Sequence, residues 1–377
     1  MNVNQRNTFI CSSVSHIAIL TNIIKVLDST WKNILILAPR SYKEKRKINL
    51  YLKNNSTEFD EIEFIPSSST ALRNILALYD DSWYRYLENV VTYNLVVFTD
   101  KILFVNVAMQ LIQANKIIIC QEGTGIYNES RLPRKEIIKN NLLNLFIKLK
   151  KPSLGYSYIH QDQGRSKMIT HTLAVDLIKD HPVFKGRNNT FVSSLWQASE
   201  NAHDLSMLDK PAMKVVWIGF NMTRFISNHD YIDLTNKILN VLALSELENI
   251  YYIPHPTEPH SITELVRSKG VEVVSISVTA EEWLLENRNA LVFSVASSTI
   301  LNVASVLIYK PIYLFDLFDH TPNGSSDLAV NLRKSNKWLC LESIDSFKEY
   351  LSNPIINETS YDFAVANARS INNLLIS

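Results

Sequence analysis

The sequence predicts an α/β protein made of two doubly wound domains, and three observations lead to this prediction. The chain has 377 residues, which is more than one ordinary hydrophobic core takes. Short runs rich in Ile and Val alternate with longer amphipathic runs, as in parallel sheets that helices cover on both faces. This alternation occurs twice, on either side of the polar stretch 185–211, which has few strand-like runs.

The first domain is expected to cover residues 1–190. Its short apolar runs predict strands at Thr8–Cys11, Ile34–Leu37, Ile62–Ile65, Leu95–Phe98 and Ile117–Cys120. The amphipathic runs between them predict helices at Ala18–Leu27, Thr70–Tyr86 and Leu103–Ala114. A strand, a crossover helix and a second strand in this order make a parallel, right-handed unit, so we expect a parallel sheet.

The second domain is expected to cover residues 191–358 and to repeat this architecture. Its predicted strands are Val215–Phe220, Ile250–Ile253, Val271–Val274, Leu291–Phe293, Ile312–Phe315 and Trp338–Leu341. Its predicted helices are Tyr231–Leu244, Ile262–Ser268 and Ile300–Leu307. The last segment, 359–377, contains a helical pattern at Tyr361–Leu375 and is expected to pack back on the first domain.

The composition excludes several classes of protein. A chain with 46% hydrophobic and 20% charged residues can bury large cores and is not disordered. A formal net charge of +1 argues against a generally basic nucleic-acid binder, so no nucleic-acid partner is expected. The three cysteines are widely spaced, without a CxxC pair, which predicts neither a disulfide framework nor a zinc site. Because the sequence has neither a signal-peptide pattern nor an apolar run long enough to span a bilayer, we expect a cytoplasmic protein.

Two facing doubly wound domains are expected to bind a ligand in a central cleft, at the carboxyl ends of their strands. The stretch Ile117–Tyr127, IIICQEGTGIY, places Glu122 directly after a predicted strand. Gly123 and Gly125 would let the backbone turn tightly beside a ligand. A carboxylate there can act as a general base, and the alternative is a helix cap or a loop carboxylate paired with a basic side chain. The third glycine of a GxGxxG fingerprint is missing, so a dinucleotide site is not expected.

The stretch Tyr251–Glu258, YYIPHPTE, places His255 after another predicted strand. Pro254 and Pro256 restrict the backbone on both sides of it. A histidine held in this way can donate a hydrogen bond to a phosphate or protonate a leaving group. The alternative is a histidine that only caps the end of a strand.

The stretch Leu291–Ile300, LVFSVASSTI, runs from a strand into a helical pattern through hydroxyl side chains. Ser297, Ser298 and Thr299 would lie at the helix N-terminus, where free N–H groups and the helix dipole favour a phosphate. Ordinary N-capping is the alternative. No DxD motif follows a strand, so a carboxylate-held metal is not expected.

A basic segment, Arg131–Lys151, contains seven basic residues and one acid. It also carries an apolar stripe at helical spacing: Ile138, Leu142, Leu145, Phe146 and Leu149. The segment can lie on an anionic membrane or meet an acidic acceptor through Arg134, Lys135 and Lys139. The alternative is a solvated helix that packs its stripe on the domain.

In order along the chain, these motifs resemble those of the bacterial sialyltransferases with the two-domain GT-B fold. Those enzymes have an acid-acid-Gly turn, then a His-Pro pair, then a Ser-Ser or Ser-Thr pair. The capsule polysialyltransferases carry an acid-Glu-Gly-Thr-Gly-x-Tyr string, to which Gln121–Tyr127 is similar. The lipooligosaccharide sialyltransferases have a similar Asp-Gly-Thr-Gly string. The resemblance covers the motif order and the two-domain layout over most of the chain, and about a dozen residues match.

The resemblance implies a role for each matching residue. Glu122 would be the general base that deprotonates the acceptor hydroxyl, and His255 would contact the phosphate of the donor and help the nucleotide leave. Pro256 would shape the loop beneath the nucleotide. An acidic residue between the last two motifs would hold the ribose, either Glu282 or its rival Glu281. The remaining phosphate ligands would be Ser297, Ser298 and Thr299.

Two positions depart from the motifs of these families. Gln121 stands where the first acid of the turn is expected, so the second position alone can supply a base. Ile253 stands where a basic residue often precedes the histidine, so His255, the hydroxyls and a helix dipole would have to meet the charge of the phosphate.

The function implied by the resemblance is an inverting, metal-independent sialyltransferase without a cofactor. It would move sialic acid from CMP-sialic acid to a hydroxyl of a capsule or lipooligosaccharide glycan. The resemblance also implies that the protein would associate peripherally with the cytoplasmic face of the inner membrane or with capsule assembly proteins. Two alternatives keep the fold: a transferase using CMP-Kdo or a UDP-sugar, and a non-catalytic glycan-binding component of a capsule assembly complex.

Overall fold

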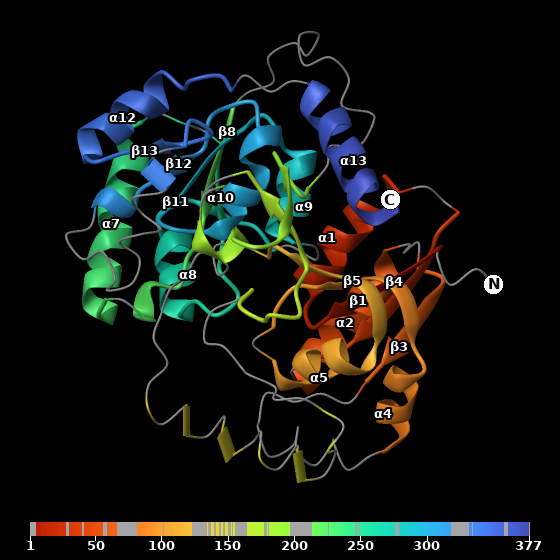
Figure 1. Ribbon diagram of the computed structural model, residues 1–377. Coiled ribbons are helices and arrows are strands. Elements are labelled where there is room, and N and C mark those ends of the chain that lie inside the picture. Colours follow the sequence, from red (N-terminus) through yellow and green to blue (C-terminus); the bar gives the residue numbers. More distant parts are fainter. Residues whose placement is uncertain are drawn as a thin grey trace. The chain divides into compact units, whose positions relative to one another are not determined.

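A computed structural model of the protein divides into two compact units: Met1–Leu195 with Ala366–Ser377, and Trp196–Val365. Each unit is a parallel sheet flanked by helices (Figure 1). The structure describes residues 5–376 except 28, 29, 40, 56–58, 66–80, 101, 123–133, 135, 136, 139, 140, 143, 144, 146, 147, 150, 151, 153, 155–163, 177, 178, 180, 197–212, 225, 246, 248, 276–278, 318–331, 334 and 358–360.

The first unit is built on a seven-stranded sheet in the order β3-β2-β1-β4-β5-β6-β7. Its strands are β1 (Arg6–Cys11), β2 (Lys32–Leu37), β3 (Glu61–Phe64), β4 (Val91–Val97), β5 (Gln113–Cys120), β6 (His171–Val175) and β7 (Asn188–Val192). Every neighbouring pair is parallel. The chain runs outward from β1 to β3 and returns to β4, so the direction of winding reverses between β1 and β4.

The helices described in this unit are α1 (Val14–Ile24), α2 (Tyr42–Asn54), α4 (Asp81–Glu88) and α5 (Leu103–Leu111), with a 3₁₀ turn at Pro182–Phe184. α1 and α2 each begin after a serine, whose side-chain oxygen accepts a hydrogen bond from a backbone N–H of the first turn. The five predicted strands are present. The first eleven residues of the predicted helix Thr70–Tyr86 lie outside the described residues, and its remainder falls in α4.

Two strands of this sheet, β6 and β7, were not predicted from the sequence. β6 reads HTLAV and β7 reads NNTFV, so both begin with polar residues and lack the continuous Ile and Val runs of the inner strands. β7 forms the edge of the sheet, where burial is less complete, and it falls inside the segment that was predicted to be a polar connection. The first unit therefore extends to Leu195.

The last helix, α13 (Tyr361–Ile376), contacts the first unit with its carboxyl-terminal half, which lies beside α1 (Figure 1). The side-chain amide of Asn94, on β4, donates to the carbonyl of Leu375 at 2.7 Å. The amide of Asn372 donates to the carbonyl of Val26, just after α1, at 2.6 Å. The last residues of the chain, Ala366–Ser377, are therefore part of the first unit.

The second unit is built on a six-stranded parallel sheet in the order β10-β9-β8-β11-β12-β13. Its strands are β8 (Lys214–Ile218), β9 (Ile250–Ile253), β10 (Glu272–Val273), β11 (Ala290–Ser294), β12 (Ile312–Tyr313) and β13 (Leu339–Cys340). All six correspond to predicted strands, although the outer ones are only two residues long. Here the winding reverses between β8 and β11.

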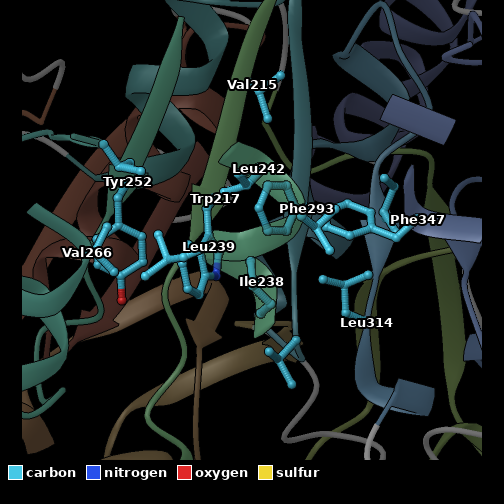
Figure 2. Packing of buried hydrophobic residues seen from close by; sticks show 14 of the residues in the cluster. Val215, Trp217, Ile238, Leu239, Leu242, Tyr252, Val266, Phe293, Leu314 and Phe347 are labelled. Carbon is cyan, nitrogen blue, oxygen red and sulfur yellow. The ribbon is translucent and has the colours of Figure 1, made fainter. Parts of the chain in front are cut away.

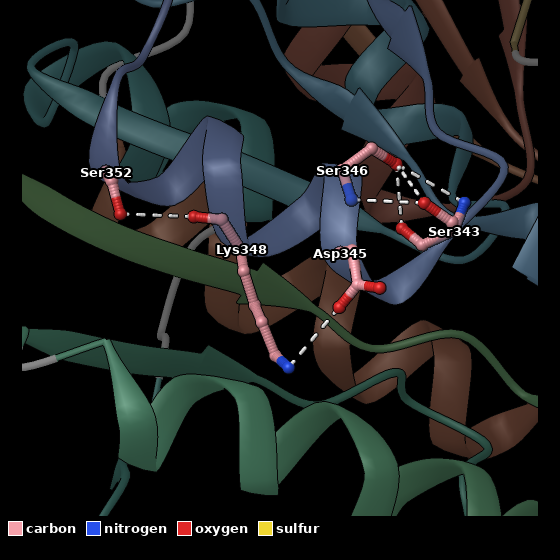
Figure 3. A network of polar contacts seen from close by, with 5 residues as sticks. All are labelled: Ser343, Asp345, Ser346, Lys348 and Ser352. Atoms are coloured by element: carbon pink, nitrogen blue, oxygen red, sulfur yellow. Dashed lines mark hydrogen bonds and ion pairs between the residues drawn. The ribbon is translucent and has the colours of Figure 1, made fainter.

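Five helices of this unit are described: α7 (Asn228–Leu244), α8 (His260–Ser268), α9 (Ala280–Glu286), α10 (Ser298–Val303) and α12 (Ile344–Ser352). Short 3₁₀ turns lie at Met222–Arg224, Ala304–Val306 and Phe315–Leu317. α12 begins with a capping box, in which Ser343 and Ser346 each accept a hydrogen bond from the other's backbone N–H (Figure 3). One turn on, Lys348 pairs with Asp345 at 3.5 Å.

The core of the second unit is a cluster of aromatic and aliphatic side chains between the sheet and its helices (Figure 2). Trp217 of β8 lies at its centre, 4.9 Å from the ring of Tyr252 on β9 and 5.8 Å from that of Phe293 on β11, between ring centroids. Phe293 in turn packs against Phe347 of α12. Because the central strands meet through large buried rings, their carboxyl ends are held in a fixed relation to one another.

Candidate active site

The first group of candidate residues lies at the carboxyl end of β5. β5 ends at Cys120, and Glu122 follows it with 34% of its side chain exposed. Gln121, between them, is fully buried, and its Oε1 accepts a hydrogen bond from the backbone N–H of Val175 at the end of β6, at 2.8 Å. The glutamine that stands in place of an acid therefore joins β5 to β6, and Glu122 is the carboxylate of this stretch that reaches solvent.

His16 is the partner of Glu122, and the sequence analysis missed it. It lies in the first turn of α1, next to the carboxyl end of β1, and only 1% of its side chain is exposed. Its Nε2 lies 2.8 Å from Oε1 of Glu122, at an angle outside good hydrogen-bond geometry, so the contact is a close polar one. The imidazole ring also stacks on Phe98, with 4.4 Å between centroids.

The other ring nitrogen of His16 determines where the proton lies. Nδ1 accepts a hydrogen bond from the backbone N–H of Ser12 at 3.2 Å. An acceptor nitrogen carries no proton in neutral imidazole, so the proton is on Nε2, the nitrogen that faces Glu122. His16 therefore presents an N–H to the carboxylate and has no lone pair left to take a proton from a substrate.

Two cysteines also lie close enough to Glu122 to be affected by its charge. Two buried thiols, Cys11 and Cys120, lie at the ends of β1 and β5. Burial raises the pKa of both thiols, and the negative charge of Glu122 raises it further. Both cysteines therefore stay protonated and serve as small core residues rather than nucleophiles.

Asp100 is a second carboxylate at this edge of the sheet, after β4, but it is fully buried. Its two oxygens accept hydrogen bonds from the backbone N–H groups of Gly164 and Ser166, each at 2.7 Å. These bonds tie the loop before β6 to the end of β4. Asp100 is thus a structural residue, and Glu122 is the carboxylate that can meet a substrate.

Several predicted residues near Glu122 lie outside the described part of the chain, namely Gly123, Gly125, Lys135 and Lys139. Arg134 is described and exposed. Four members of the predicted apolar stripe are also exposed, by 60% at Ile138, 52% at Leu142, 54% at Leu145 and 72% at Leu149. Among the described residues, no helix combines the length and hydropathy needed to cross a bilayer.

The second group of candidate residues lies in the second unit, at the carboxyl end of β9. His255 follows β9 within a loop that also holds Pro254 and Pro256. Its Nδ1 accepts hydrogen bonds from the backbone N–H of Thr257 at 3.2 Å and from the Thr257 hydroxyl at 3.1 Å. By the same reasoning as for His16, the proton of His255 is on Nε2. The loop thus fixes His255 as a donor from that nitrogen.

The serine motif lies at the carboxyl end of β11. Ser297 is buried and caps α10, since its Oγ accepts a hydrogen bond from the backbone N–H of Thr299 at 3.3 Å. The hydroxyl of Thr299 donates to Oε1 of Glu281 at 3.2 Å. Ser298 is half-buried. The capping role predicted as an alternative is therefore present at Ser297, and Ser298 is the more accessible hydroxyl.

The His-Pro loop and the serine motif lie on either side of the end of β8. On one side, the N–H of Gly219 donates to the carbonyl of Ile253 at 2.8 Å. On the other, the hydroxyl of Ser294 donates to the carbonyl of Ile218 at 2.7 Å and accepts from the N–H of Ser297. Because β8 and β11 flank the reversal of winding, both motifs lie where open α/β sheets bind their ligands.

The two acidic candidates of α9 have different surroundings. Glu282 forms a capping box with Thr279, since its Oε2 accepts from the backbone N–H and the hydroxyl of Thr279. Glu281 instead faces α10, and its Oε1 accepts from Thr299 and from the amide of Asn302 at 3.0 Å. Burial raises the pKa of Glu281, although these hydrogen bonds oppose the shift. Glu281, rather than Glu282, is the acid that lies against the serine motif.

A family model described as alpha-2,8-polysialyltransferase (POLYST) matches residues 7–315, which span both sheets. The chain belongs to the alpha-2,8-polysialyltransferase family. It is a glycosyltransferase with two Rossmann-like domains of GT-B type, and membership of a sialyltransferase family implies a nucleotide-sugar donor and a glycan acceptor. No curated protein matches the sequence.

Solved structures with the same fold differ widely from this family member in sequence. A protein from Listeria monocytogenes assigned as a UDP-N-acetylglucosamine 2-epimerase is 9% identical, with a TM-score of 0.58 over 98% of this chain and 95% of that one. The UDP-GlcNAc 2-epimerase of Methanocaldococcus jannaschii is 12% identical, with a TM-score of 0.55 over 98% of each chain. S. aureus MnaA is 9% identical, with a TM-score of 0.52 over 98% and 97%. At these identities the likeness concerns the fold alone.

Proposed function

We propose that this polysialyltransferase family member is an inverting, metal-independent enzyme that transfers sialic acid from CMP-sialic acid to a hydroxyl of a surface glycan. The observation that carries the donor assignment is the position of the His-Pro loop and the serine motif on both sides of the end of β8. A phosphate bound there would meet the Nε2–H of His255 from one strand end and the Ser298 hydroxyl from the other. The resemblance to sialyltransferases assigns the same two motifs, His-Pro and serine, to the binding of the donor.

Glu122 is proposed as the general base. Its carboxylate is part-exposed and lies 2.8 Å from Nε2 of the buried His16. The acceptor hydroxyl would give its proton to Glu122 as its oxygen bonds to the anomeric carbon of the sialic acid. The bond from that carbon to the phosphate oxygen breaks on the opposite face, and CMP leaves with the electron pair. One displacement of this kind inverts the anomeric configuration.

His255 and α9 would stabilise the departing nucleotide. A hydrogen bond from Nε2–H of His255 meets the charge that develops on the phosphate oxygen, so one phosphate can be bound without a metal. Among the described residues, no three His, Cys, Asp or Glu side chains gather as they would around a metal ion. We assign the ribose to Glu281 rather than Glu282, because Glu281 lies against Thr299 at the serine motif.

The experiment that tests this function measures CMP release from CMP-sialic acid with sialylated and lactose-terminated acceptors. Wild type, Glu122→Gln and His255→Ala are compared, with His229→Ala as a matched histidine control on the exposed face of α7. We expect acceptor-stimulated release in wild type and the control, and a loss of about 10²–10⁴-fold in kcat for the two variants.

Each other outcome has a definite meaning. If wild type releases no CMP with any acceptor, the proposed donor is wrong, and the same assay with CMP-Kdo and UDP-sugars tests the alternative transferase. Binding of CMP-sialic acid without turnover would support a non-catalytic component of a capsule assembly complex. Full activity in Glu122→Gln would show that Glu122 is not the general base, and it would leave the donor assignment unchanged.

We also propose that the protein works at the cytoplasmic face of the inner membrane, in contact with capsule assembly proteins. Support comes from the basic segment, whose described apolar residues are exposed rather than packed. Apolar side chains at helical spacing beside Arg134, Lys135 and Lys139 suit a surface with anionic headgroups. The same basic residues would attract a polyanionic glycan acceptor.

A further inference from the structure

Glu258, at the end of the His-Pro loop, is a largely buried acid to which the proposed reaction gives no role. Its Oε1 contacts the hydroxyl of Tyr231, on α7, and its Oε2 contacts the hydroxyl of Tyr252, on β9. Oε2 also accepts a hydrogen bond from the backbone N–H of His255 at 3.3 Å. One side chain thus joins a helix, a strand and the residue proposed to bind the phosphate.

The hydroxyl of Tyr231 has two acceptors within reach, Oε1 of Glu258 and the carbonyl oxygen of Phe220, which lies 2.7 Å away and can only accept. Tyr231 has one hydroxyl hydrogen, so when it donates to Phe220, the hydrogen between Tyr231 and Oε1 comes from a protonated Glu258. Tyr252 then donates to Oε2. With Glu258 as a carboxylic acid, each of these contacts has one hydrogen.

The pKa of Glu258 is shifted toward the protonated form. Burial raises the pKa of Glu258, although the hydrogen bonds from Tyr231, Tyr252 and the N–H of His255 oppose the shift. Burial and the proximity of Glu258 raise the pKa of both tyrosines, so both hydroxyls keep their hydrogens.

The cluster is packed so closely that Gly219, the residue after β8, must be a glycine. A Cβ atom on Gly219 would lie 2.8 Å from the backbone nitrogen of His255, 2.8 Å from the hydroxyl of Tyr252 and 3.0 Å from Oε2 of Glu258. Real Cβ atoms essentially never approach this closely. β8 therefore approaches the His255 backbone through a position that has no side chain.

We propose that Glu258 is a positioning residue for His255, a neutral acid that clamps the backbone of the His-Pro loop to α7 and β9. The clamp holds the backbone nitrogen of His255, while Thr257 holds its ring at Nδ1. The side-chain amide of Asn221 in turn donates a hydrogen bond to the backbone carbonyl of Thr257 at 2.8 Å. The backbone and the ring of His255 are thus fixed from two sides. This inference rests on the proposed function for what His255 does and on the cluster itself for how His255 is held.

The test compares Glu258→Gln with Glu258→Met, which have similar length. A glutamine amide can donate to Tyr231 and accept from Tyr252 and His255, so it replaces a neutral acid but not an ionised one. We expect Glu258→Gln to keep kcat for CMP release within about threefold, because every hydrogen bond is retained. Glu258→Met should lose about 10²-fold in kcat, since a displacement of about 1 Å at the reacting groups has that effect. Thermal melting confirms that both variants are folded.

Two measurements on the full chain are independent of the donor. Infrared difference spectra should show the C=O stretching band of a protonated carboxylic acid in wild type, absent from Glu258→Gln. Amide hydrogen exchange at His255 should be slow in wild type and Glu258→Gln and fast in Glu258→Met. If wild type releases no CMP, the proposed function is wrong. The infrared band and the exchange rates then still show whether Glu258 is a neutral acid that holds the His255 backbone.

Three results would overturn the proposal. An absent acid band would mean that Glu258 is ionised. A folded Glu258→Gln protein as inactive as Glu258→Met would mean that the negative charge itself is needed. Slow exchange at His255 in Glu258→Met would mean that the loop is held without this side chain.

Discussion

At the scale of single residues, the candidate site depends on which nitrogen of each histidine bears the proton. In both histidines a nearby backbone N–H engages Nδ1 and leaves the proton on Nε2: that of Ser12, four residues before His16, and that of Thr257, two residues after His255. His16 is buried and faces a carboxylate, whereas His255 lies in a part-exposed loop. In the proposed function, the same tautomer would orient a base in one unit and donate to a ligand in the other.

His16→Ala tests the first of these functions. Without the N–H that faces it, Glu122 loses its fixed orientation, and we expect kcat for CMP release to fall about 10- to 100-fold, less than on loss of the base itself. The KM for the donor should stay unchanged, because the residues proposed to bind the nucleotide all belong to the second unit. Steady-state kinetics beside His229→Ala checks this. A larger loss in His16→Ala than in Glu122→Gln would instead make His16 the proton acceptor.

At the scale of elements, α9 illustrates how two adjacent acids can do different work. Glu282 faces back to the start of its own helix and caps it, while Glu281 faces the next helix, α10. The spacing between motifs suits both residues equally, since they are neighbours in the sequence. The capping box at Thr279–Glu282, which spans an N-cap and its third residue, is the local pattern that distinguishes them.

Substitution of these two acids should separate stability from donor binding. Glu282→Ala removes the capping box and is expected to reduce the free energy of unfolding by about 0.5–2 kcal/mol, with the donor KM unchanged. Glu281→Gln keeps the cap and is expected to raise the donor KM. Chemical denaturation and steady-state kinetics on both variants measure the two effects. If Glu282→Ala raised the donor KM more than Glu281→Gln, the ribose assignment would return to Glu282.

At the scale of the whole molecule, the two units share one plan. Each sheet is parallel, each reverses its winding beside its first strand, and each has its candidate residues at carboxyl strand ends. α13 links the end of the chain to its start, through Asn94 and Asn372. Transfer to a surface glycan further requires the molecule to be near its acceptor, and the basic segment is the element proposed for this.

Recruitment of the whole molecule can be tested with liposomes. We expect the full chain to float with vesicles rich in anionic lipid at low salt and to be released as salt rises. Leu142→Ser with Leu149→Ser should weaken flotation, because both side chains are exposed on the stripe. Leu244→Ser, an equally exposed leucine in α7, is the matched control. Flotation unaffected by the stripe variant would refute membrane contact through this segment.

Much of the fold follows from local pattern. All eleven predicted strands are present, and the central ones could be predicted because inner strands of a parallel sheet are buried on both faces and are apolar, as at the end of β5 and in β11. β7 escaped prediction because an edge of the sheet tolerates polar residues such as those that begin NNTFV. β6 lies inside the sheet, but its apolar run is short because the strand begins with His171 and Thr172. The interdomain cleft predicted from the sequence stays a prediction.

For the site, the sequence by itself determined that Glu122, His255 and the serine motif each follow an apolar strand, and a parallel sheet gathers its strand ends at one edge. The family resemblance drawn from those motifs agrees with the family model over residues 7–315. Only the tertiary structure decided the partners, namely His16 for Glu122, Glu281 for Thr299 and Glu258 for His255. The first two contacts join residues far apart in the chain, and the third depends on how tyrosines from α7 and β9 meet at one carboxyl group. The position of a strand end can be predicted from the spacing of apolar residues in the sequence. The direction of a side chain there cannot, because it depends on packing between residues that are distant in the sequence.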